Sequence, residues 1–485
     1  MTDFTSAIPA LFQAIPALAV VSRTPETYLV GGAVRDMLMG SAPLDYDIVV
    51  PEDPQTLADT ISRDTGAFFF KLGKDRQTVF RGRLKDHTID LVRMAGGSIE
   101  SDLHLRDFTV NAMAVHLGSC TFLDPTQGQK DLASRTIRMV SEQAFLSDPL
   151  RMLRAYRFAA TLNFEIEKKT ESAIKTHSRL IRRPAGERIR EELLRLLDAP
   201  GAAAYLNKMK GSGLLFDLFP ELMDERACMQ NHHHCFDVLD HTLSACRHLD
   251  SFLNGNGMAT APALRMAIDG IDRRSKPILK LAMLLHDIGK PRTRSVDPAG
   301  AVHFWGHEKF GAGMAEAITG RLKFSTPDAD SLRELIENHL RPVLLYQAHR
   351  NQSLTRKGIV RLFRSLNDHT PDLLIMALAD AYAKTETPCN VDPSFAGFIV
   401  DLIKTYFQDY LPRKNNAPLI TGQDLITLFG MQPSPMFKTI LTAVEEARLS
   451  QTLAGRQDAI AMVHTWLSSN DKRYSGTGAQ NRKKD

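Results

Sequence analysis

The hydrophobic pattern of this chain changes once, near residue 148, and that change limits what the chain can fold into. Before it, short runs rich in Val, Ile, Phe and Thr alternate with helical stretches; the runs are TYLV, YDIVV, FFFKL, TVFRGRL, TIDLVRM and NAMAVHL. After it, apolar residues recur at three-to-four spacing, as in LRMLRAYRFAATL and ERIREELLRLL. Strands followed by helices predict an α+β fold, with a mixed head on an all-helical body.

The order of these segments predicts four parts. We expect a head over 1–140, a helical neck over 141–228, a helical domain over 229–390 and a helical C-terminal region over 391–485. The last segment, SSNDKRYSGTGAQNRKKD, is polar and basic. We interpret it as a solvated tail, with contact to RNA as the alternative.

Several classes of protein are excluded by simple features of the chain. No run of about 18 apolar residues is present, which argues against a membrane-spanning helix. The N-terminus has no basic region ahead of its apolar stretches, and the five scattered cysteines form no CxxC pair. We therefore expect a cytoplasmic protein without a disulfide framework or a membrane partner. The net charge of +4 permits nucleic acid as a partner but does not require it.

A glycine pair stands at a predicted strand-to-helix turn. The run Tyr28–Val30 leads into Gly31 and Gly32, and a helix carrying Arg35 follows. Such a pair lets backbone N–H groups approach a phosphate closely, and Arg35 adds a charge-assisted contact. Taken alone, a glycine pair is more often only a turn.

Carboxylates on the following strands point to a metal site. Asp45 and Asp47 lie two residues apart in LDYDIVV, hence on one face of a strand. Two adjacent anions repel each other unless a cation lies between them, and Mg²⁺ prefers such ligands together with substrate phosphates. Asp90 in TIDLV is a third strand carboxylate. Three convergent carboxylates are typical of two-metal nucleotidyl transfer.

These motifs, together with LRDFTVNAMAV (105–115), LDPTQGQKDL (123–132) and SDPLRMLRAYRFAA (147–160), resemble the class II tRNA nucleotidyltransferases. That family contains the CCA-adding enzymes, and the bacterial poly(A) polymerases share its head. The resemblance spans about residues 27–200 and implies a polymerase-beta-like head. The Mg²⁺ ligands it implies are Asp45 and Asp47, beside which we expect Asp90 to act as the third catalytic carboxylate. The residues it implies at the triphosphate and sugar are Gly31, Gly32, Arg35, Arg106 and Asp107.

The family's base-reading motif, EDxxR, falls on residues 147–151. Asp148, Arg151 and Arg154 recur every three residues and Arg157 extends the stripe. An Asp beside an Arg presents an acceptor beside a donor, which matches cytosine and adenine but not uracil or guanine. The resemblance therefore implies base selection without a template. The alternative is a helix N-cap followed by a solvated arginine face.

The chain departs from the family pattern at three places. Leu105 replaces the first Arg of the RRD motif and Ser147 replaces the Glu of EDxxR, but neither position carries a contact assigned above. Only the 15 residues 91–105 separate Asp90 from Arg106, where members that add the full CCA have a longer loop. This resembles the CC-adding members, so addition of the terminal A stays open.

The neck predicted behind the head is basic. Residues 151–195 contain 12 Lys and Arg against 6 Asp and Glu. Such a surface suits RNA phosphates, with a solvated face as the alternative.

A second constellation lies in the helical body. His241, the pair His286 and Asp287 in LLHDIGK, and Asp380 each fall within an apolar helical stretch, where an unpaired ionisable group is costly. Their order resembles the HD phosphohydrolase superfamily over about 230–385. The resemblance adds His307 and His339 as ligands of a second metal, and implies Mn²⁺, Ni²⁺, Co²⁺ or Mg²⁺ and phosphatase or cyclic phosphodiesterase activity on RNA ends. The alternative is a helical scaffold without activity.

The sequence thus predicts a nucleotidyltransferase in which the tRNA 3′-hydroxyl attacks the α-phosphate of CTP, and of ATP for the full CCA, releasing pyrophosphate. Mg²⁺ is the expected cofactor. Four alternatives stay open: a CC-adding enzyme, a poly(A) polymerase, an HD phosphohydrolase whose head only binds RNA or nucleotide, and a non-catalytic RNA-binding scaffold. The sequence does not predict an oligomeric state.

Overall fold

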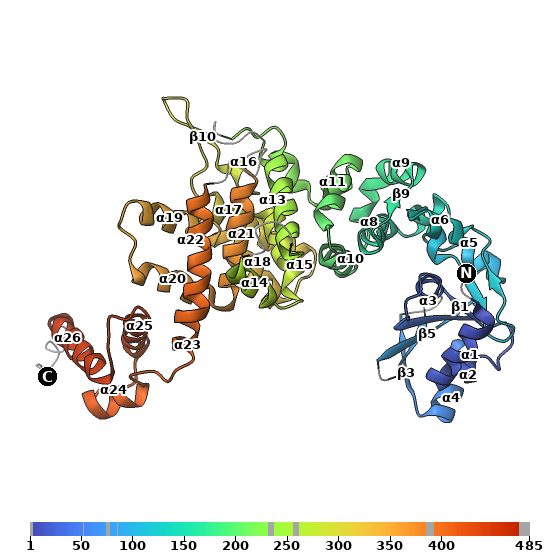
Figure 1. Ribbon diagram of the computed structural model, residues 1–485, viewed down its shortest axis with the longest axis horizontal. Helices are drawn as coiled ribbons and strands as arrows, with labels where there is room; N and C mark the ends of the chain where they lie inside the picture. The colour runs from blue at the N-terminus through green and yellow to red at the C-terminus, as the bar shows by residue number, and fades with distance from the viewer. Residues whose placement is uncertain are drawn as a thin grey trace, which may run out of the picture. The chain divides into compact units, whose positions relative to one another are not determined.

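The protein is described here by a computed structural model (Figure 1), which describes residues 3–51, 53–73, 78–84, 86–230, 237–255, 261–384 and 392–474. The histidines at 232–234, Cys235, Cys389 and the end of the tail lie outside these ranges. The chain divides into two compact units, Met1–Met223 with Arg321–Phe324, and Asp224–Gly320 with Ser325–Asp485. None of the described helices combines the length and the apolar character needed to cross a lipid bilayer. The four-part division stays a prediction.

The first unit begins with a seven-stranded sheet. Its strands are β1 (Tyr28–Val30), β2 (Asp45–Val50), β3 (Phe68–Leu72), β4 (Val79–Leu84), β5 (His87–Arg93), β6 (Ala114–His116) and β7 (Phe122–Leu123), in the order β3-β4-β5-β2-β1-β6-β7. Only the β2–β5 pairing is parallel; the other pairings are antiparallel. The predicted mixed head is confirmed.

The two faces of this sheet are covered differently. One face carries Leu29, Ile48 and Ile89, and it is buried with α1 (Phe4–Ala14), α2 (Pro16–Val21), α3 (Gly32–Leu38) and α4 (Pro54–Thr65). On the opposite face, Val30 and Val49 pack with residues of α5 (Ile99–His104). Because side chains alternate along a strand, Asp45, Asp47 and Val49 share that second face. Its apolar end is therefore covered and its carboxylate end is left for a site.

The rest of the first unit is mainly helical, and from α8 onward this agrees with the change of pattern near residue 148. They are the 3₁₀ turn η2 (Thr109–Asn111), α6 (Gly128–Ala133), α7 (Gln143–Ser147), α8 (Leu150–Leu162), α9 (Lys168–His177), η3 (Ser178–Arg182), α10 (Gly186–Asp198), α11 (Ala202–Ser212) and α12 (Leu214–Leu218). The short strands β8 (Thr136–Ile137) and β9 (Glu165–Ile166) pair in parallel.

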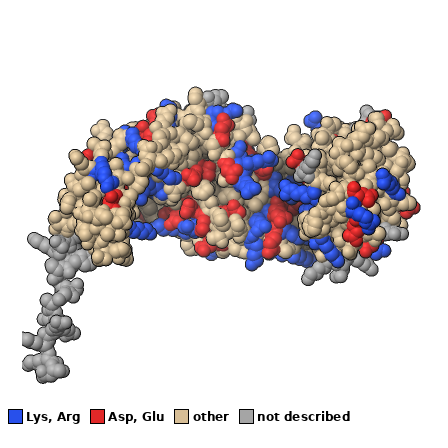
Figure 2. Space-filling model, turned by 90° about the horizontal axis from the view of Figure 1, so that it is seen from below, with Lys and Arg blue, Asp and Glu red and all other residues tan. Residues whose placement is uncertain are grey.

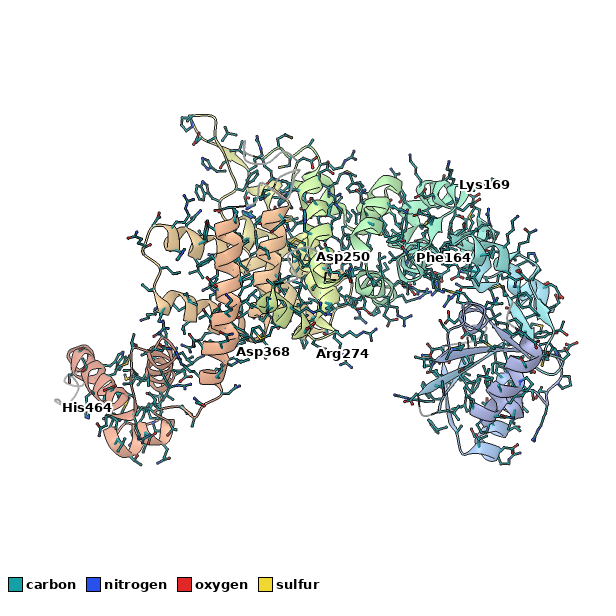
Figure 3. All side chains as sticks on the ribbon, viewed as in Figure 1. Phe164, Lys169, Asp250, Arg274, Asp368 and His464 are labelled. Carbon is teal, nitrogen blue, oxygen red and sulfur yellow. The ribbon has the colours of Figure 1, made fainter. Side chains whose placement is uncertain are left out.

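The second unit is almost entirely helical. Its elements include α13 (Val238–Leu253), α14 (Pro262–Asp269), α15 (Ser275–Leu285), α16 (Lys290–Thr293), the hairpin β10 (Ser295–Val296) and β11 (Val302–His303), α17 (His307–Arg321), α18 (Thr326–Asn338), α19 (Arg341–Arg350), α20 (Arg356–Leu366), α21 (Thr370–Tyr382) and α22 (Pro393–Lys404). A buried ion pair of 2.6 Å between Lys280 on α15 and Asp250 on α13 joins two of them; Figure 3 labels Asp250.

The chain ends in a small helical group of its own. A π-helical segment (Thr405–Tyr410) and α23 (Leu411–Lys414) lead to α24 (Gly422–Phe429), α25 (Pro435–Leu449) and α26 (Arg456–Tyr474). Leu425, Ile440 and Val463 bury one apolar core there. The described part of this segment is therefore helical.

One local expectation is wrong. HDIGK does not lie within a helix: α15 ends at Leu285, residues 286–289 form a turn, and α16 begins at Lys290. A Cβ on Gly289 would lie 2.2 Å from the carbonyl oxygen of His307, so α17 begins directly against this turn.

Candidate active site and metal centre

The register of the head sheet brings the three predicted carboxylates onto one face. Asp47 on β2 stands opposite Asp90 on β5, and Asp45 lies two residues before Asp47. Neighbouring strands are about 4.8 Å apart, so Asp47 and Asp90 are adjacent across the sheet. Asp90 in turn stands opposite Arg81 on β4.

Arg81 is a member of this cluster that the sequence reading did not assign. Its Nε donates to Asp90 Oδ1 at 2.8 Å and its Nη2 to Asp90 Oδ2 at 2.6 Å. Both oxygens of the third carboxylate are thus held by one guanidinium. The strand TVFRGRL was recognised, and its alternation alone places Arg81 on the face opposite Phe80.

Asp47 is half-buried, whereas Asp45 is exposed. Burial raises its pKa, and Asp90 and Asp45 add to the effect, which Arg106 partly offsets. Gly31 has φ +72°, and a Cβ there would lie 3.0 Å from Arg106 Nη1 and 3.4 Å from Asp47 Oδ2. Neighbouring carboxylates that raise the pKa of Asp47 in this way fit a divalent cation, since Mg²⁺ would supply the positive charge that the cluster needs.

Arg35 and Arg106 stand beside the glycine turn in fixed orientations. Arg35 is buried and its Nη1 donates to Asn111 Oδ1 at 2.7 Å. Arg106 donates from Nε and Nη2 to Asp102 Oδ1 at 3.1 and 3.0 Å, which leaves Nη1 directed at Gly31. Two guanidinium groups therefore flank the turn that the sequence predicts for the triphosphate.

Asp148 and Arg151, the predicted base-reading residues, bind other partners rather than each other. Asp148 lies just ahead of α8, where its Oδ1 accepts from the Leu150 N–H at 3.3 Å and its Oδ2 from Arg188 Nη2 at 2.8 Å. Arg151, in the first turn of α8, donates to the carbonyl oxygen of Leu105 at 2.8 Å. Both side chains are held from outside, so each keeps part of its hydrogen-bonding capacity.

Arg154 and Arg157, by contrast, are absorbed in a buried carboxylate network. Arg154 donates to Asp107 Oδ2 at 2.9 and 2.7 Å and to Glu192 at 3.1 Å, and Arg157 donates to Glu192 at 2.5 Å. Asp107 Oδ1 also accepts from the Phe108 N–H and from Asn111. Burial opposes its charge, but Arg154 holds the pKa of Asp107 at about 2. This geometry fastens α8 to the head.

In the second unit the predicted histidines and carboxylates converge on Asp287. Its Oδ2 lies 3.2 Å from His286 Nε2 and 3.7 Å from His241 Nε2, and His241 Nε2 lies 2.8 Å from Asp380 Oδ1. Its Oδ1 lies 3.4 Å from His307 Nε2 and 3.7 Å from His339 Nε2. One carboxylate therefore faces two groups of ligands at once.

Backbone carbonyls orient three of these imidazoles. The Nδ1 atoms of His286, His307 and His339 lie 2.8, 2.7 and 2.7 Å from the carbonyl oxygens of Met283, Phe304 and Ile336. A carbonyl partner requires Nδ1 to carry the proton, which leaves Nε2 as the lone-pair donor toward Asp287.

The same cluster passes a test for a metal. His307 Nε2 and His339 Nε2 are 3.2 Å apart and fully enclosed, although two lone pairs repel. His286 Nε2 is buried, and the nearest carboxylate oxygen to it is Asp287 Oδ2 at 3.2 Å. Burial lowers the pKa of His339 to about 3, so this imidazole is neutral, as a ligand must be. These imidazoles and the Asp287 carboxylate would therefore suit divalent cations.

Comparison with known proteins follows the same division. Residues 27–138 match the model of the poly A polymerase head domain, and residues 163–225 match that of the probable RNA and SrmB-binding site of polymerase A. Residues 232–385 match the HD domain. An A-adding tRNA nucleotidyltransferase of Deinococcus radiodurans is 32% identical over 450 residues, which cover 91% of this chain and 96% of that protein. The chain belongs to the tRNA nucleotidyltransferase family.

Further relatives agree with this membership, and the predicted resemblance is confirmed. A CC-adding tRNA nucleotidyltransferase of Thermus thermophilus is 31% identical over 458 residues, 93% of this chain and 96% of that protein. The structure of the Thermotoga maritima CCA-adding enzyme complexed with tRNA has a TM-score of 0.61 at 21% identity, covering 95% and 96% of the two chains, and so shares the fold.

Two buried polar residues of this tRNA nucleotidyltransferase, Lys290 and Glu225, were not predicted as site residues from the sequence. Lys290 Nζ lies 2.6 Å from Asp287 Oδ2 and donates to Gln230 Oε1 at 2.7 Å. Glu225 is fully buried, and neither of its oxygens has a hydrogen-bond partner among the described residues. Lys290 is the last residue of the HDIGK motif and could have been identified from it, whereas nothing in the local sequence distinguishes Glu225.

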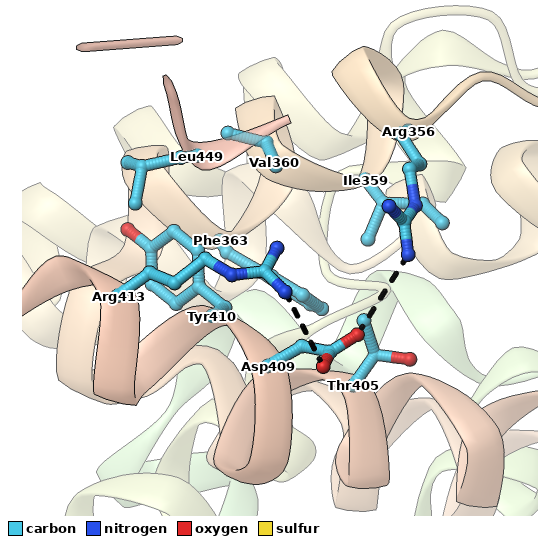
Figure 4. A pocket seen from close by; sticks show the side chains of 9 residues that line it. All are labelled: Arg356, Ile359, Val360, Phe363, Thr405, Asp409, Tyr410, Arg413 and Leu449. Atoms are coloured by element: carbon cyan, nitrogen blue, oxygen red, sulfur yellow. Dashed lines mark ion pairs between the residues drawn. The ribbon is translucent and has the colours of Figure 1, made fainter. Parts of the chain in front are cut away.

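A pocket in the second unit contains none of the predicted site residues (Figure 4). It lies between α20 and the π-helical segment, and Asp409 stands there 3.9 Å from Arg356 and 3.7 Å from Arg413. Its arginines already face a carboxylate, so we assign it no ligand.

Several basic side chains of the predicted neck stay exposed. They are Lys168, Lys169, Lys175, Arg179, Arg182, Arg183, Arg188 and Arg195. On the face of the molecule drawn in Figure 2, basic and acidic side chains are interspersed. A role of the neck in holding RNA stays a prediction.

Proposed function

We propose that this protein adds C residues, and the terminal A, to the 3′ end of tRNA from CTP and ATP without a nucleic acid template. The observation that carries this is the row Arg81–Asp90–Asp47 across three paired strands, in a chain of the tRNA nucleotidyltransferase family. Its substrates are those of the cytoplasm, where we expect the protein to act.

The residues divide the work as follows. Asp45, Asp47 and Asp90 would hold Mg²⁺, which when bound would activate the 3′-hydroxyl and stabilise the charge at the phosphates. The Gly31–Gly32 turn admits the triphosphate, and Arg35 and Arg106 neutralise its oxygens. Asp148 accepts from the amino group of cytosine or adenine and Arg151 donates to the ring nitrogen. Arg154, Arg157 and Asp107 keep α8 in place.

The finer part of the proposal is which nucleotides the protein adds to the tRNA, and how many. Relatives covering nearly the whole chain are named A-adding and CC-adding, at 32% and 31% identity. The 15-residue segment 91–105 favours a CC-adding enzyme. A poly(A) polymerase is the alternative supported by the head match.

A second activity is supported by the cluster around Asp287. We expect His241, His286, Asp287 and Asp380 to bind one divalent ion and Asp287, His307 and His339 another, Mn²⁺, Ni²⁺, Co²⁺ or Mg²⁺. The function favoured is hydrolysis of phosphomonoesters or 2′,3′-cyclic phosphates at RNA ends.

The test uses tRNAs ending before CCA, after C and after CC, each incubated with CTP, ATP, UTP and GTP separately and together. Products are resolved to single nucleotides. A full enzyme extends the first tRNA by CCA, a CC-adding enzyme stops after CC, and an A-adding enzyme extends only the last. A ladder of many A residues indicates a poly(A) polymerase.

Asp47→Ala is the matched negative variant. Because a bound metal is worth several kcal/mol in the transition state, we expect incorporation to fall about a thousandfold with the fold intact. Glu187→Ala, an exposed carboxylate on α10, is the control. Unchanged incorporation by Asp47→Ala would disprove the metal assignment.

A further inference from the structure

An aromatic pair continues the catalytic face of the sheet beyond the carboxylates. Phe70 on the edge strand β3 stands opposite Arg81, and Phe68 stands opposite Arg83. The row therefore runs Phe70, Arg81, Asp90, Asp47 across four strands. Nothing assigned so far explains why two phenylalanines stand on this face.

Their orientation is fixed by the neighbouring residue. Phe69 stands opposite Gly82, and a Cβ on Gly82 would lie 2.5 Å from the Phe69 ring. The missing side chain lets Phe69 lie flat against β4 on the core side of the sheet. Because side chains alternate, Phe68 and Phe70 must then point to the catalytic face.

Both rings are open to solvent and lie together. Phe68 is 75% exposed and Phe70 41%, and their centroids are 6.5 Å apart with 25° between the ring planes. Neighbouring exposed apolar side chains often mark a binding site, because monomeric proteins rarely expose contiguous apolar patches. Arg81 and Arg83, both exposed, lie beside them on β4.

The positions of the assigned groups indicate which substrate contacts Phe68 and Phe70. The triphosphate is assigned to the Gly31–Gly32 turn and Arg106, on the β1 side of Asp47. The attacking 3′-hydroxyl must reach the same carboxylates from the opposite side, across Asp90. Strands are about 4.8 Å apart, so Phe70 stands about 10 Å beyond Asp90, along the way to the 3′-hydroxyl.

We propose that Phe68 and Phe70 form a stacking platform for the last unpaired bases of the tRNA 3′ end, with Arg81 and Arg83 at the intervening phosphates. Aromatic rings beside arginines on an exposed sheet face bind single-stranded RNA in this way, and stacking accepts any base. This suits an enzyme whose primer end changes with each added nucleotide. The proposal rests on the carboxylate assignment made above.

The first test is kinetic. Phe70→Ala is expected to raise the KM for tRNA about 5- to 150-fold, the range that loss of one stacked base gives, while the KM for the nucleotide and kcat at saturating tRNA stay near wild type. Phe70→Trp should retain the wild-type KM. Phe310→Ala, a phenylalanine 48% exposed in the second unit, is the matched control. An unchanged KM for tRNA in Phe70→Ala overturns the platform.

The second test needs no catalysis. An acceptor-stem RNA carrying 2-aminopurine at the penultimate nucleotide is titrated with protein in the absence of Mg²⁺. Stacking should quench its fluorescence with wild type and with Phe310→Ala, and less with Phe70→Ala. If Phe70→Ala quenches the fluorescence as strongly as wild type does, the stacking proposal is wrong. A wild-type protein that is inactive on every tRNA would refute the proposed function, and the quenching experiment would still decide the stacking proposal. A wild-type dimer that Phe70→Ala dissociates, with an unchanged KM for tRNA, would mean that β3 pairs with a second copy and would also overturn it.

Discussion

Asp148 and Arg151 are held by partners other than each other, which makes their roles separable by mutation. Arg188 donates to one carboxylate oxygen of Asp148, and Arg151 donates to the backbone carbonyl oxygen of Leu105. In Asp148→Ala the amino group of cytosine or adenine loses its acceptor, at a cost of about 1–3 kcal/mol. We expect the preference for CMP over UMP to fall about 5- to 150-fold, as measured by nucleotide competition on a tRNA that wild type extends.

The control for this experiment is Arg182→Ala, which removes an exposed arginine paired with Asp217 elsewhere in the same unit. It should leave base selection unchanged. If Asp148→Ala retained the wild-type preference, another group would be reading the base.

Arg81 makes a prediction about metal dependence. It donates to both oxygens of Asp90, so we expect it to compete with Mg²⁺ for this carboxylate. The Arg81 side chain is 45% exposed, and such a pair is worth at most about 1 kcal/mol. In Arg81→Ala the Mg²⁺ concentration for half-maximal incorporation, measured at saturating tRNA, should fall about 2- to 5-fold. A higher requirement for Mg²⁺ would show that Arg81 supports the metal site rather than competing with it.

At the scale of elements, the joint between η2 and α8 depends on one buried ion pair. Asp107 is almost fully enclosed and accepts from Phe108, Asn111 and Arg154. Removing one partner of a buried pair leaves the other charge uncompensated, which typically costs 3–5 kcal/mol. We expect Asp107→Ala to lower the free energy of unfolding of the first unit by about that amount in urea denaturation, whereas Asp217→Ala, at an exposed pair, should lower it by less than about 1 kcal/mol.

The same carboxylate predicts a pH dependence. Arg154 lowers the pKa of Asp107 from 3.8 to about 2, so between these values the unfolded chain binds the additional proton. The stabilisation is therefore complete above about pH 4 and is lost as the pH falls through 2, on the order of 2 kcal/mol in total. Urea denaturation from pH 5 to pH 2 measures it, and the Asp107→Asn variant should lack this part of the slope.

The helices and strands that carry the site were largely readable from the sequence, because alternation and helical spacing report which face is buried. Asp45 and Asp47 were placed on one face for this reason, and Asp148 beside the start of α8. The partners were not readable. Arg81 reaches Asp90 only through the β4–β5 register, and Glu192 reaches Arg154 across 38 residues. The turn at HDIGK was missed because its cause, the start of α17 against Gly289, lies 18 residues away.

At the scale of the whole molecule, the two candidate centres belong to different compact units. The carboxylates of the head lie within residues 1–223, and the cluster around Asp287 lies within the second unit. We expect His286→Ala with Asp287→Ala to abolish binding of Mn²⁺ or Ni²⁺ and any metal-dependent hydrolysis of 2′,3′-cyclic phosphates. Nucleotide addition should stay at the wild-type rate.

The converse variant, Asp47→Ala, should lose nucleotide addition and keep metal binding in the second unit. Equilibrium dialysis and the two enzyme assays, run on the same preparations, check both statements. A wild-type protein that binds none of the four metals would leave the second unit as a scaffold. Loss of nucleotide addition in the His286 and Asp287 double variant would show that the units are coupled.

The pairing of β2, β5, β4 and β3 also restricts which insertions and deletions this protein can tolerate. Gain or loss of a single codon within residues 79–93 would turn Arg81 or Asp90 toward the apolar layer, while two codons would preserve the face and displace the row. Neither outcome leaves the four residues aligned. Changes in the length of this protein should therefore be confined to the ends of the strands. An insertion scan of the gene should lose nucleotide addition with one inserted codon and with two inserted codons inside these strands.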